Sequence, residues 1–449
     1  MVALVCRPFA QGLEQSPLKL VLVNRYFHPD ESATSQMVSG LATAFATRGW
    51  NIHVITGRQR YSNPRAALAR TESFGPVQVH RTWSTRFGRG KLSGRAIDYI
   101  SFSLTALWLM LLLVRRTDII VTTTDPPLMS VLSWLAAEVK GAKRINWLHD
   151  LFPEIAIKLG VIPRGAASRL LSTLRNWSLS GADMNVAIGE RMAAYLQRQG
   201  VPPERLSVIH NWSDGTMIRP IAHGQNPLRA EWGLIGRFVV GYSGNFGRVH
   251  EFRTILEAAQ QLCSEPAIRF LFIGNGHSLA AIEAEARQRA LPNIICKPFQ
   301  PLSELQKSLA VVDLHLVSLQ AALEGLIVPS KFYGIAAAGR PTLFVGDENG
   351  EIAEILREAC CGATVPIGAA GALAGHIRRL QRSGKQCERW GSNARAFFTR
   401  RFDLPLAADK WARIVGEVAG ANHNTQHEPE TNSAVGADRS RKVAIAPEP

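Results

Sequence analysis

Apolar and polar positions alternate with two different periods along this chain. Leu18–Val23 has the sequence LKLVLV between polar flanks, which predicts a buried strand. After a polar loop, apolar residues recur at helical spacing over Met37–Arg48, and Gly49 ends this pattern. Asn51–Thr56 is a second strand-like run. Strand, loop, helix and strand in this order predict a parallel βαβ unit.

The alternation of strands and helices continues and then restarts in the second half of the chain. In the first half we expect further strands at Val77–Trp83, Asp118–Thr122, Arg144–Leu148, Asp183–Ile188 and Leu206–Ile209. In the second half we expect strands at Phe238–Tyr242, Arg269–Ile273, Asn293–Cys296, Asp313–Val317, Thr342–Val345 and Ala363–Val365. A polar stretch containing Pro220, Gly224 and Pro227 separates the halves. This pattern predicts an α/β protein with two Rossmann-like, doubly wound domains facing a cleft.

A chain of 449 residues is long enough for two such cores. We expect an N-terminal domain over residues 18–215, a linker over 216–234, a C-terminal domain over 235–400 and a final helix within 401–420. Residues 1–17 contain no apolar core long enough for a signal peptide, so we expect a disordered leader. Residues 421–449 are polar and rich in Asn, Glu, Ser and Pro, which predicts a disordered tail.

The formal net charge of +15 points to an anionic partner, and part of this charge is concentrated in one segment. Between Gly57 and Arg95 a single acid, Glu72, faces nine basic residues: Arg58, Arg60, Arg65, Arg70, Arg81, Arg86, Arg89, Lys91 and Arg95. These basic residues lead into an apolar helix rather than alternating with aromatic residues, so we do not expect a nucleic-acid partner. An anionic membrane surface fits the segment better.

The apolar run that follows, Tyr99–Val114, is shorter than the ~20 residues that span a bilayer. One interpretation is a core helix that covers the first sheet, and the other is a helix in the membrane interface. Both hold if the helix uses one face for each role. A spanning helix would interrupt the sheet, which resumes at Asp118. The six cysteines lack metal-ligand spacing, and we expect reduced thiols in the cytoplasm.

The stretch GYSGNFGRVHEF, Gly241–Phe252, has the composition of a phosphate-binding turn. We expect a strand to end at Tyr242, and Gly244 and Gly247 to open a turn before a helix whose N-terminus attracts an anion. The side chains that we expect to add contacts are Ser243, Asn245 and Arg248. An ordinary glycine turn of an α/β domain is the alternative.

A second stretch, ALEGLIVPSKFYGIAAAGRP, combines a phosphate-binding cation with hydrogen-bond acceptors. Ser330 and Lys331 are expected where a helix begins, and a lysine is a compact charge suited to a diphosphate. Glu324 can accept hydrogen bonds from sugar hydroxyls, while Gly325 frees the backbone before Leu326. A plain surface loop is the alternative.

The stretch NWLHDLFPEIA places His149 and Asp150 just beyond the end of a predicted strand. Open α/β sheets bind ligands at this edge, and a His–Asp pair can move a hydroxyl proton or orient an acceptor. A structural histidine cap remains the alternative. Asn211, Trp212 and Asp214 precede the joint between the halves, where we expect them to serve as hinge and turn residues.

Together these stretches resemble glycosyltransferase family 4, and in particular its bacterial members in colanic acid, O-antigen and capsule synthesis. The resemblance covers nearly all of the chain from Leu18 to Val418. It is carried by DIIVTTTDPP at Asp118–Pro127, HDLFPE at His149–Glu154, NWSD at Asn211–Asp214, YSGNFG at Tyr242–Gly247 and EGLIVPSKFY at Glu324–Tyr333. Two departures stand out: Gly334 occupies the place where a ribose-binding glutamate is expected, and Asn245 replaces a diphosphate-binding arginine.

The resemblance implies a GT-B fold and retaining sugar transfer from a nucleotide-sugar donor, without a metal ion or other cofactor. It implies a donor site in the C-terminal domain and an acceptor, a polyprenyl-diphosphate saccharide, at the N-terminal domain. His149, Asp150 and Glu324 would then be the catalytic residues. We expect the enzyme at the cytoplasmic face of the inner membrane. An epimerase or phosphorylase with the same two-domain form, or a catalytically silent membrane scaffold, remains open as an alternative.

Overall fold

The computed structural model describes residues 18–88, 92–276 and 278–420, so our expectations for residues 1–17 and 421–449 lie outside the described residues. Its first sheet has the strand order β3-β4-β2-β1-β5-β6-β7-β8. These strands are β1 (Lys19–Val23), β2 (Asn51–Gly57), β3 (Thr71–Phe74), β4 (Val77–Thr82), β5 (Ile119–Thr123), β6 (Lys143–Leu148), β7 (Met184–Ala187) and β8 (Leu206–Val208). All pairs are parallel except the hairpin of β3 and β4, and β3 is a strand that the sequence did not predict.

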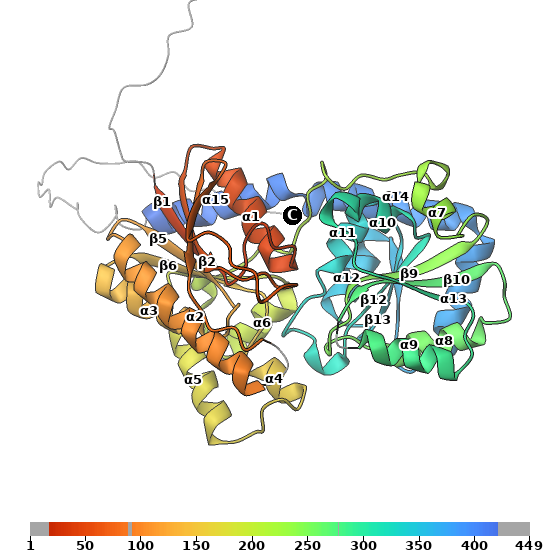
Figure 1. Cartoon of the computed structure of the whole chain (residues 1–449), viewed down its shortest axis with the longest axis horizontal. Helices are drawn as coiled ribbons and strands as arrows, with labels where there is room; N and C mark the ends of the chain where they lie inside the picture. Colours follow the sequence, from red (N-terminus) through yellow and green to blue (C-terminus); the bar gives the residue numbers. More distant parts are fainter. Residues whose placement is uncertain (1–17, 89–91, 277, 421–449) are drawn as a thin grey trace, which may run out of the picture.

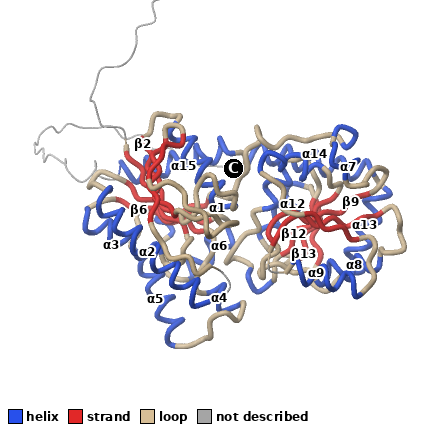
Figure 2. Tube along the Cα trace, viewed as in Figure 1, coloured by secondary structure: helices blue, strands red, loops and turns tan. Residues whose placement is uncertain are grey.

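The second sheet is entirely parallel and has the order β11-β10-β9-β12-β13-β14. Its strands are β9 (Phe238–Asn245), β10 (Ile268–Asn275), β11 (Ile294–Lys297), β12 (Leu314–Ser318), β13 (Thr342–Val345) and β14 (Gly362–Val365). Figure 2 shows the two sheets side by side, each flanked by helices. This arrangement confirms the predicted α/β class with two doubly wound sheets.

Helices cover both faces of each sheet (Figure 1). With the first sheet lie α1 (Ala33–Ala46), α2 (Leu92–Leu113), α3 (Met129–Lys140), α4 (Glu154–Lys158), α5 (Ala166–Ser180), α6 (Glu190–Arg198) and α15 (Leu404–Gly420). With the second lie α7 (Pro227–Glu231), α8 (Arg253–Gln261), α9 (Leu279–Gln288), α10 (Leu305–Ala310), α11 (Lys331–Ala337), α12 (Glu351–Ala359), α13 (Ala370–Arg382) and α14 (Gly384–Arg401). Strand β1 shows why two layers form: Leu20 and Leu22 enter one core, and Val21 and Val23 enter the core beneath α2.

Both sheets have a point where the strand order reverses direction. In the first sheet β1 lies between β2 and β5, and in the second β9 lies between β10 and β12. Ligands of open α/β sheets bind outside the carboxyl ends of the strands at such switch points. The topology therefore predicts ligand-binding residues after β1 and β5 in one domain, and after β9 and β12 in the other.

Helix α15 returns from the second half of the chain to the first. It packs against α1, and its Trp411 side chain is fully buried. The Trp411 ring meets the Trp147 ring of β6 edge-on, with 4.9 Å between the ring centroids. The Trp212 ring stacks on Trp147 with 5.2 Å between the ring centroids, so this motif residue is a packing residue beside the joint. An aromatic cluster thus joins β6, the chain crossing and the last helix.

Helix α2 uses its two faces differently. Phe102, Ala106 and Met110 are fully buried against the sheet, whereas Leu104 and Trp108 are 59% and 63% exposed. By length and composition α2 is the one described helix that is apolar enough to cross a membrane, with a candidate span of Ser93–Leu113. Helix α2 follows β4 and precedes β5 in the chain, and it packs along the first sheet. One of its faces therefore lies in the core, and the opposite face is exposed.

The basic segment before α2 is less charged at its surface than its composition predicted. The Arg81 side chain is buried and forms an ion pair with Glu72, with 2.7 Å between nitrogen and oxygen. Arg58 and Arg60 donate hydrogen bonds to backbone carbonyls of the surrounding loops. Arg89 and Lys91 lie outside the described residues. The count of basic residues therefore overestimated the charge available to a partner.

The tryptophan cluster provides a test of how α15 contributes to stability. Replacing the buried Trp411 with Ala should lower the free energy of unfolding by about 3–5 kcal/mol, because it leaves a cavity against Trp147. The matched variant Trp108→Ala, at an exposed tryptophan, should change stability by less than about 0.5 kcal/mol. Urea unfolding followed by tryptophan fluorescence measures both values, and equal effects of the two substitutions would contradict this packing.

Candidate active site

The two most distinctive motifs of the sequence meet at the interface between the domains. Leu151 N–H of the N-terminal domain donates a hydrogen bond to Leu326 O of the C-terminal domain at 3.0 Å, and Asp150 forms a β-bridge with Ile327. Gly325 has φ of +74°, and a Cβ there would lie 3.2 Å from Arg191 O. The loop after β12 therefore needs glycine at this position to lie against the N-terminal domain.

The donor motif after β9 has a different shape from the one predicted. Strand β9 runs to Asn245, three residues beyond the expected end at Tyr242, and α8 begins only at Arg253. Gly244 with φ of +120° and Gly274 with φ of +148° stay paired across β9 and β10, where a Cβ on Gly274 would lie 1.9 Å from Gly244 O. The glycines thus form a close backbone platform; the strand end predicted at Tyr242 is wrong, and the predicted helix follows the turn at Arg253.

Lys331 lies beside this platform as the first residue of α11. A Cβ on Gly244 would lie 2.9 Å from Lys331 Cε, so the lysine stem fills the space that this glycine leaves. Lys331 Nζ is 2.9 Å from His250 Nε2 and 5.1 Å from the centroid of the Tyr242 ring. Burial lowers the pKa of Lys331 to about 7. A half-buried cation whose nearest described partner is the neutral His250 ring is the feature that an anionic ligand at this switch point would stabilise.

His250 fixes the orientation of this lysine, although no sequence motif pointed to this histidine. His250 Nδ1 lies 2.6 Å from Ser318 O, so Nδ1 carries the proton and Nε2 accepts from Lys331. Burial and the nearby Lys331 charge lower the pKa of His250 to about 3, which keeps the ring neutral. Its sequence signal was weak: a histidine two positions after Arg248, within the glycine stretch itself.

The other predicted donor residues differ in what they offer. The Ser243 hydroxyl is buried and has no hydrogen-bond partner among the described residues, whereas Asn245 and Arg248 are exposed. Ser330 precedes α11 as its N-cap residue but makes no side-chain cap hydrogen bond. The Leu326 side chain packs into the core, so this residue contributes its backbone. Gly247 lies in the turn between β9 and α8.

Glu324 is linked to the N-terminal domain through a second glutamate. Its Oε1 accepts a hydrogen bond from Glu351 N–H at 2.7 Å, at the start of α12, while its Oε2 has no partner among the described residues. The Glu351 carboxylate in turn accepts from Glu190 N–H at 3.1 Å and Arg191 N–H at 2.9 Å, which begin α6. His210 lies 3.0 Å from the same carboxylate. Glu351 is thus a buried contact between domains that the sequence analysis missed.

These environments shift the two glutamates in opposite directions. Burial raises the pKa of Glu324, although the hydrogen bond from Glu351 N–H opposes this shift. Burial would also raise the pKa of Glu351, but the hydrogen bonds from His210 and two backbone N–H groups lower it overall. Glu351 therefore stays charged as the domain link, and Glu324 is the more easily protonated of the two.

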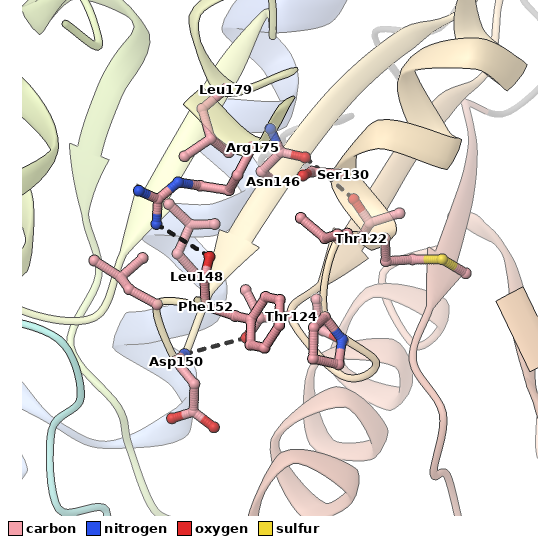
Figure 3. Close-up of a pocket in the computed structure, with 14 residues that line it drawn as sticks. Thr122, Thr124, Ser130, Asn146, Leu148, Asp150, Phe152, Arg175 and Leu179 are labelled. Atoms are coloured by element: carbon pink, nitrogen blue, oxygen red, sulfur yellow. Dashed lines mark hydrogen bonds between the residues drawn. The ribbon is translucent and has the colours of Figure 1, made fainter. Parts of the chain in front are cut away.

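In the N-terminal domain, His149 and Asp150 separate into different roles. The His149 ring is buried against Trp147, with 4.7 Å between centroids, and burial lowers its pKa to about 3. This position favours the structural alternative for His149. Asp150 is exposed at the carboxyl edge, and its N–H donates to Thr124 Oγ1 at 3.1 Å (Figure 3). Desolvation beside Ile327 and, to a lesser extent, the Asp125 charge raise the pKa of Asp150 to about 6.

A small cavity lined by both apolar and polar side chains lies beside Asp150 (Figure 3). Its volume of about 20 Å³ accommodates a single water molecule and no sugar. Arg175 lines it and forms a bidentate ion pair with Glu154, at 2.6 and 2.9 Å. The proline–glutamate end of the HDLFPE motif therefore stabilises the loop that carries Asp150, and a ligand would bind on the open side of Asp150.

Gly334 is the place where the family's ribose-binding glutamate is expected. A Cβ at Gly334 would lie 3.4 Å from Leu309 Cδ1 and 3.9 Å from Ile218 Cδ1. Gly334 offers no side chain to a ribose, so we still expect this contact to come from another residue.

Comparison with known proteins identifies the family. Residues 32–212 match the family described as Glycosyl transferase 4-like domain, and residues 226–397 match Glycosyl transferases group 1. With two parallel α/β domains whose switch points face each other, the chain has the GT-B glycosyltransferase fold. It belongs to glycosyltransferase family 4 and is related to the colanic acid and O-antigen enzymes.

Two curated relatives are similar to the chain over about half of its length. The chain is 33% identical over 255 residues to the probable glycosyltransferase WbjE of Pseudomonas aeruginosa, covering 56% of this chain and 63% of WbjE. It is 26% identical over 226 residues to the putative colanic acid biosynthesis glycosyl transferase WcaI of Escherichia coli strain K12, covering 49% of this chain and 55% of WcaI. The matches therefore span less than two thirds of each relative.

Solved structures share the fold over nearly the whole chain. Sucrose-phosphate synthase of Thermosynechococcus elongatus has a TM-score of 0.73 at 16% identity, covering 90% of this chain and 100% of that one. Anabaena HepE, in a crystal structure with UDP and glucose, has a TM-score of 0.67 at 15% identity, covering 89% of this chain and 99% of that one.

The half-buried Lys331 makes stability depend on pH. Its pKa is about 7 in the folded protein and about 10.4 in an unfolded chain. Between these values the unfolded chain binds the proton more strongly, so the free energy of unfolding rises with pH; below pH 7 the full cost of the buried charge is present. Lys331→Met removes this cost, and we expect it to be more stable than the wild type by roughly 2–4 kcal/mol at pH 6. The difference should shrink as the pH rises from 7 to 10.

The control for this measurement is Lys385→Met, at an exposed lysine of α14. Denaturant unfolding from pH 6 to 10 should give a stability difference that does not change with pH for this variant. A difference for Lys331→Met that is equally flat would show that the lysine is solvated and not buried.

Proposed function

We propose that this protein is a retaining glycosyltransferase that transfers a sugar from a nucleotide-sugar donor to a polyprenyl-diphosphate saccharide in bacterial surface polysaccharide synthesis. The observation that carries the proposal is the meeting of two switch points. Lys331 and Gly244 lie at the one in the C-terminal domain, and the loop that leads from β12 toward Lys331 contacts Asp150. The names of WbjE and WcaI support the polysaccharide setting.

The donor diphosphate would bind between the glycine platform of β9 and Lys331. The backbone approaches closely there because Gly244 and Gly274 lack side chains, and Lys331 supplies a cation in low-dielectric surroundings. A bound diphosphate would raise the pKa of Lys331 and keep it protonated. UDP in the HepE crystal structure supports a nucleotide as the donor's leaving group.

Retaining transfer of this type requires above all that the leaving diphosphate be stabilised, because negative charge develops on it as the sugar departs. Lys331 would stabilise this charge without requiring a metal ion. Asp150, with its pKa near 6, would orient the acceptor hydroxyl and accept its proton through a hydrogen bond. Glu324 would hold sugar hydroxyls through Oε2, which the protein leaves without a partner among the described residues. We assign His149 to supporting the Asp150 loop.

Lys331→Ala tests the donor site directly. It should reduce kcat/KM by about 2–4 kcal/mol in transition-state free energy, because the leaving group loses its nearest cation. The assay is sugar transfer from a panel of nucleotide sugars to a lipid-linked acceptor, in buffer containing EDTA, preceded by thermal-shift screening of nucleoside diphosphates. Lys385→Ala is the matched control. Unchanged kinetics for Lys331→Ala would refute this site, and loss of wild-type activity in EDTA would refute the metal-free mechanism.

The protein would carry out this transfer while bound to a membrane through an apolar face of three adjacent helices. This apolar face consists of Ile100, Leu104, Trp108 and Leu112 of α2, Leu135 and Val139 of α3, and Leu170, Leu174 and Trp177 of α5. All are more than a third exposed, and Trp134 of α3 contacts Trp177 at 4.2 Å between centroids. In Figure 1 the three helices lie next to one another on the outer side of the first domain.

Exposed basic residues border the apolar face and favour an anionic surface. Arg115 and Arg116 follow the end of α2, Arg86 precedes its start, and Arg164 and Arg169 lie at the start of α5. Apolar burial and charge together provide the two signals that stable peripheral attachment requires. This position would place the domain interface near the acceptor's lipid.

Vesicle co-sedimentation tests the attachment. We expect binding to vesicles with anionic lipid and weaker binding to neutral vesicles, because each basic residue contributes about 1 kcal/mol near an anionic surface. Leu104→Gln with Trp108→Gln should reduce binding to both kinds of vesicle. Arg115→Glu with Arg116→Glu should reduce binding to anionic vesicles at low salt only. Ile235→Gln, at an exposed residue outside the apolar face, is the control, and absence of binding to either vesicle would refute the attachment.

A further inference from the structure

Two arginines and a tyrosine meet at the switch point of the N-terminal sheet. Arg25 follows β1, and its N–H donates a hydrogen bond to the backbone carbonyl of Asp125, which follows β5, at 2.9 Å. Tyr99 of α2 reaches the same point: Arg25 Cζ lies 4.7 Å and Arg95 Cζ 5.2 Å from the centroid of its ring. Two guanidinium groups are thus placed around one aromatic ring at an edge where such sheets bind ligands.

Arg25 is unusual among the buried arginines of the described chain. Its side chain is 7% exposed, yet its guanidinium forms no ion pair or hydrogen bond with any described residue. The comparably buried Arg175 and Arg229 pair with Glu154 and Asp313. A buried charge without a carboxylate partner lowers stability, and an anion bound from solution would compensate it.

Arg95 and Tyr99 add two more donors to this cluster. Arg95 is exposed, and its Nε donates to the Tyr99 hydroxyl at 2.7 Å. The hydroxyl keeps its own proton, since burial and the Asp125 charge raise the pKa of Tyr99. It can therefore donate onward to an oxyanion. Two guanidinium groups against the single carboxylate of Asp125 leave the described cluster with a net positive charge.

This cluster is a direct neighbour of Asp150. The Asp125 carbonyl accepts from Arg25 N–H, and the preceding residue, Thr124, accepts from Asp150 N–H at 3.1 Å. In the other direction the cluster continues into the apolar face, because Ile100 and Leu104 follow Tyr99 along α2. One helix thus joins a cationic end near Asp150 to an exposed apolar surface.

We propose that Arg25, Arg95 and Tyr99 bind the diphosphate of the lipid-linked acceptor. The lipid chain then leaves along α2 toward the membrane, and the acceptor sugar extends from the diphosphate toward Asp150. Arginine side chains suit this ligand because their planar forks bind phosphate oxygens in pairs. The inference rests on the proposed function, since it names the group by which that acceptor is held.

Binding of short polyprenyl phosphates to the full chain tests the site without a membrane. The probes are farnesyl diphosphate, farnesyl monophosphate, farnesol and inorganic pyrophosphate, measured by isothermal titration calorimetry. We expect farnesyl diphosphate to bind most tightly. Arg25→Gln and Arg95→Gln should each raise its Kd at least tenfold, and Tyr99→Phe severalfold. Arg198→Gln, at an exposed arginine at the far end of α6, should leave the Kd unchanged.

Several results would overturn the proposal. One is an unchanged farnesyl diphosphate affinity in folded Arg95→Gln and Arg25→Gln proteins; Arg95 is exposed, so its variant keeps the test valid if Arg25→Gln unfolds. Another is equal affinity for pyrophosphate and farnesyl diphosphate, which would indicate a site for soluble anions. Nucleoside diphosphate binding is measured on the same samples. If the wild type and the variants bind nucleotide equally well and the substitutions leave the Kd of farnesyl diphosphate unchanged, only this inference fails. If the wild type binds no nucleotide, the proposed function is refuted.

Discussion

The contact of the loop after β12, at Glu324–Leu326, with the N-terminal domain is the constraint on which the candidate site depends. It consists of the Leu151–Leu326 hydrogen bond, the close approach of Gly325 to Arg191 and the buried Glu351 carboxylate at the start of α6. Each of these three contacts alone would hold the domains together only weakly. Together they place the carboxyl edges of two separate sheets against each other, and a group at either edge can then act on a ligand bound at the other.

Both sites follow from the same topological rule applied twice. In each sheet the chain leaves the central strand toward one side and later returns to pair on its other side. The loops that follow these neighbouring strands therefore diverge, and a ligand can reach the backbone groups between them. The two domains fill this position differently. Glycines and one lysine line it in the C-terminal domain, where a backbone platform suits a diphosphate, whereas arginines and a tyrosine line it in the N-terminal domain. A shared architecture thus supports different ligand chemistry.

The sequence predicted the strand pattern and the motifs because those depend on local periodicity. It missed β3, whose residues TESF lack an alternating apolar pattern, and it ended β9 too early because Gly244 normally ends a strand. His250, Glu351 and Arg25 were missed for another reason. Their significance lies in partners far along the chain: Lys331, the start of α6 and Tyr99. Periodicity carries no information about such contacts, and neither did it reveal that His149 is enclosed by Trp147.

The return of α15 to the first domain affects the order in which the protein can fold. Ribosomes deliver the N-terminal residues first, and domains commonly fold as they emerge. Here the cluster around Trp147 lacks Trp411 until the last helix has been synthesised. The half of the protein made first therefore keeps an open apolar groove while the other half is translated, and its final packing step comes at the end of synthesis. The first domain therefore completes its core only after the second domain has been synthesised.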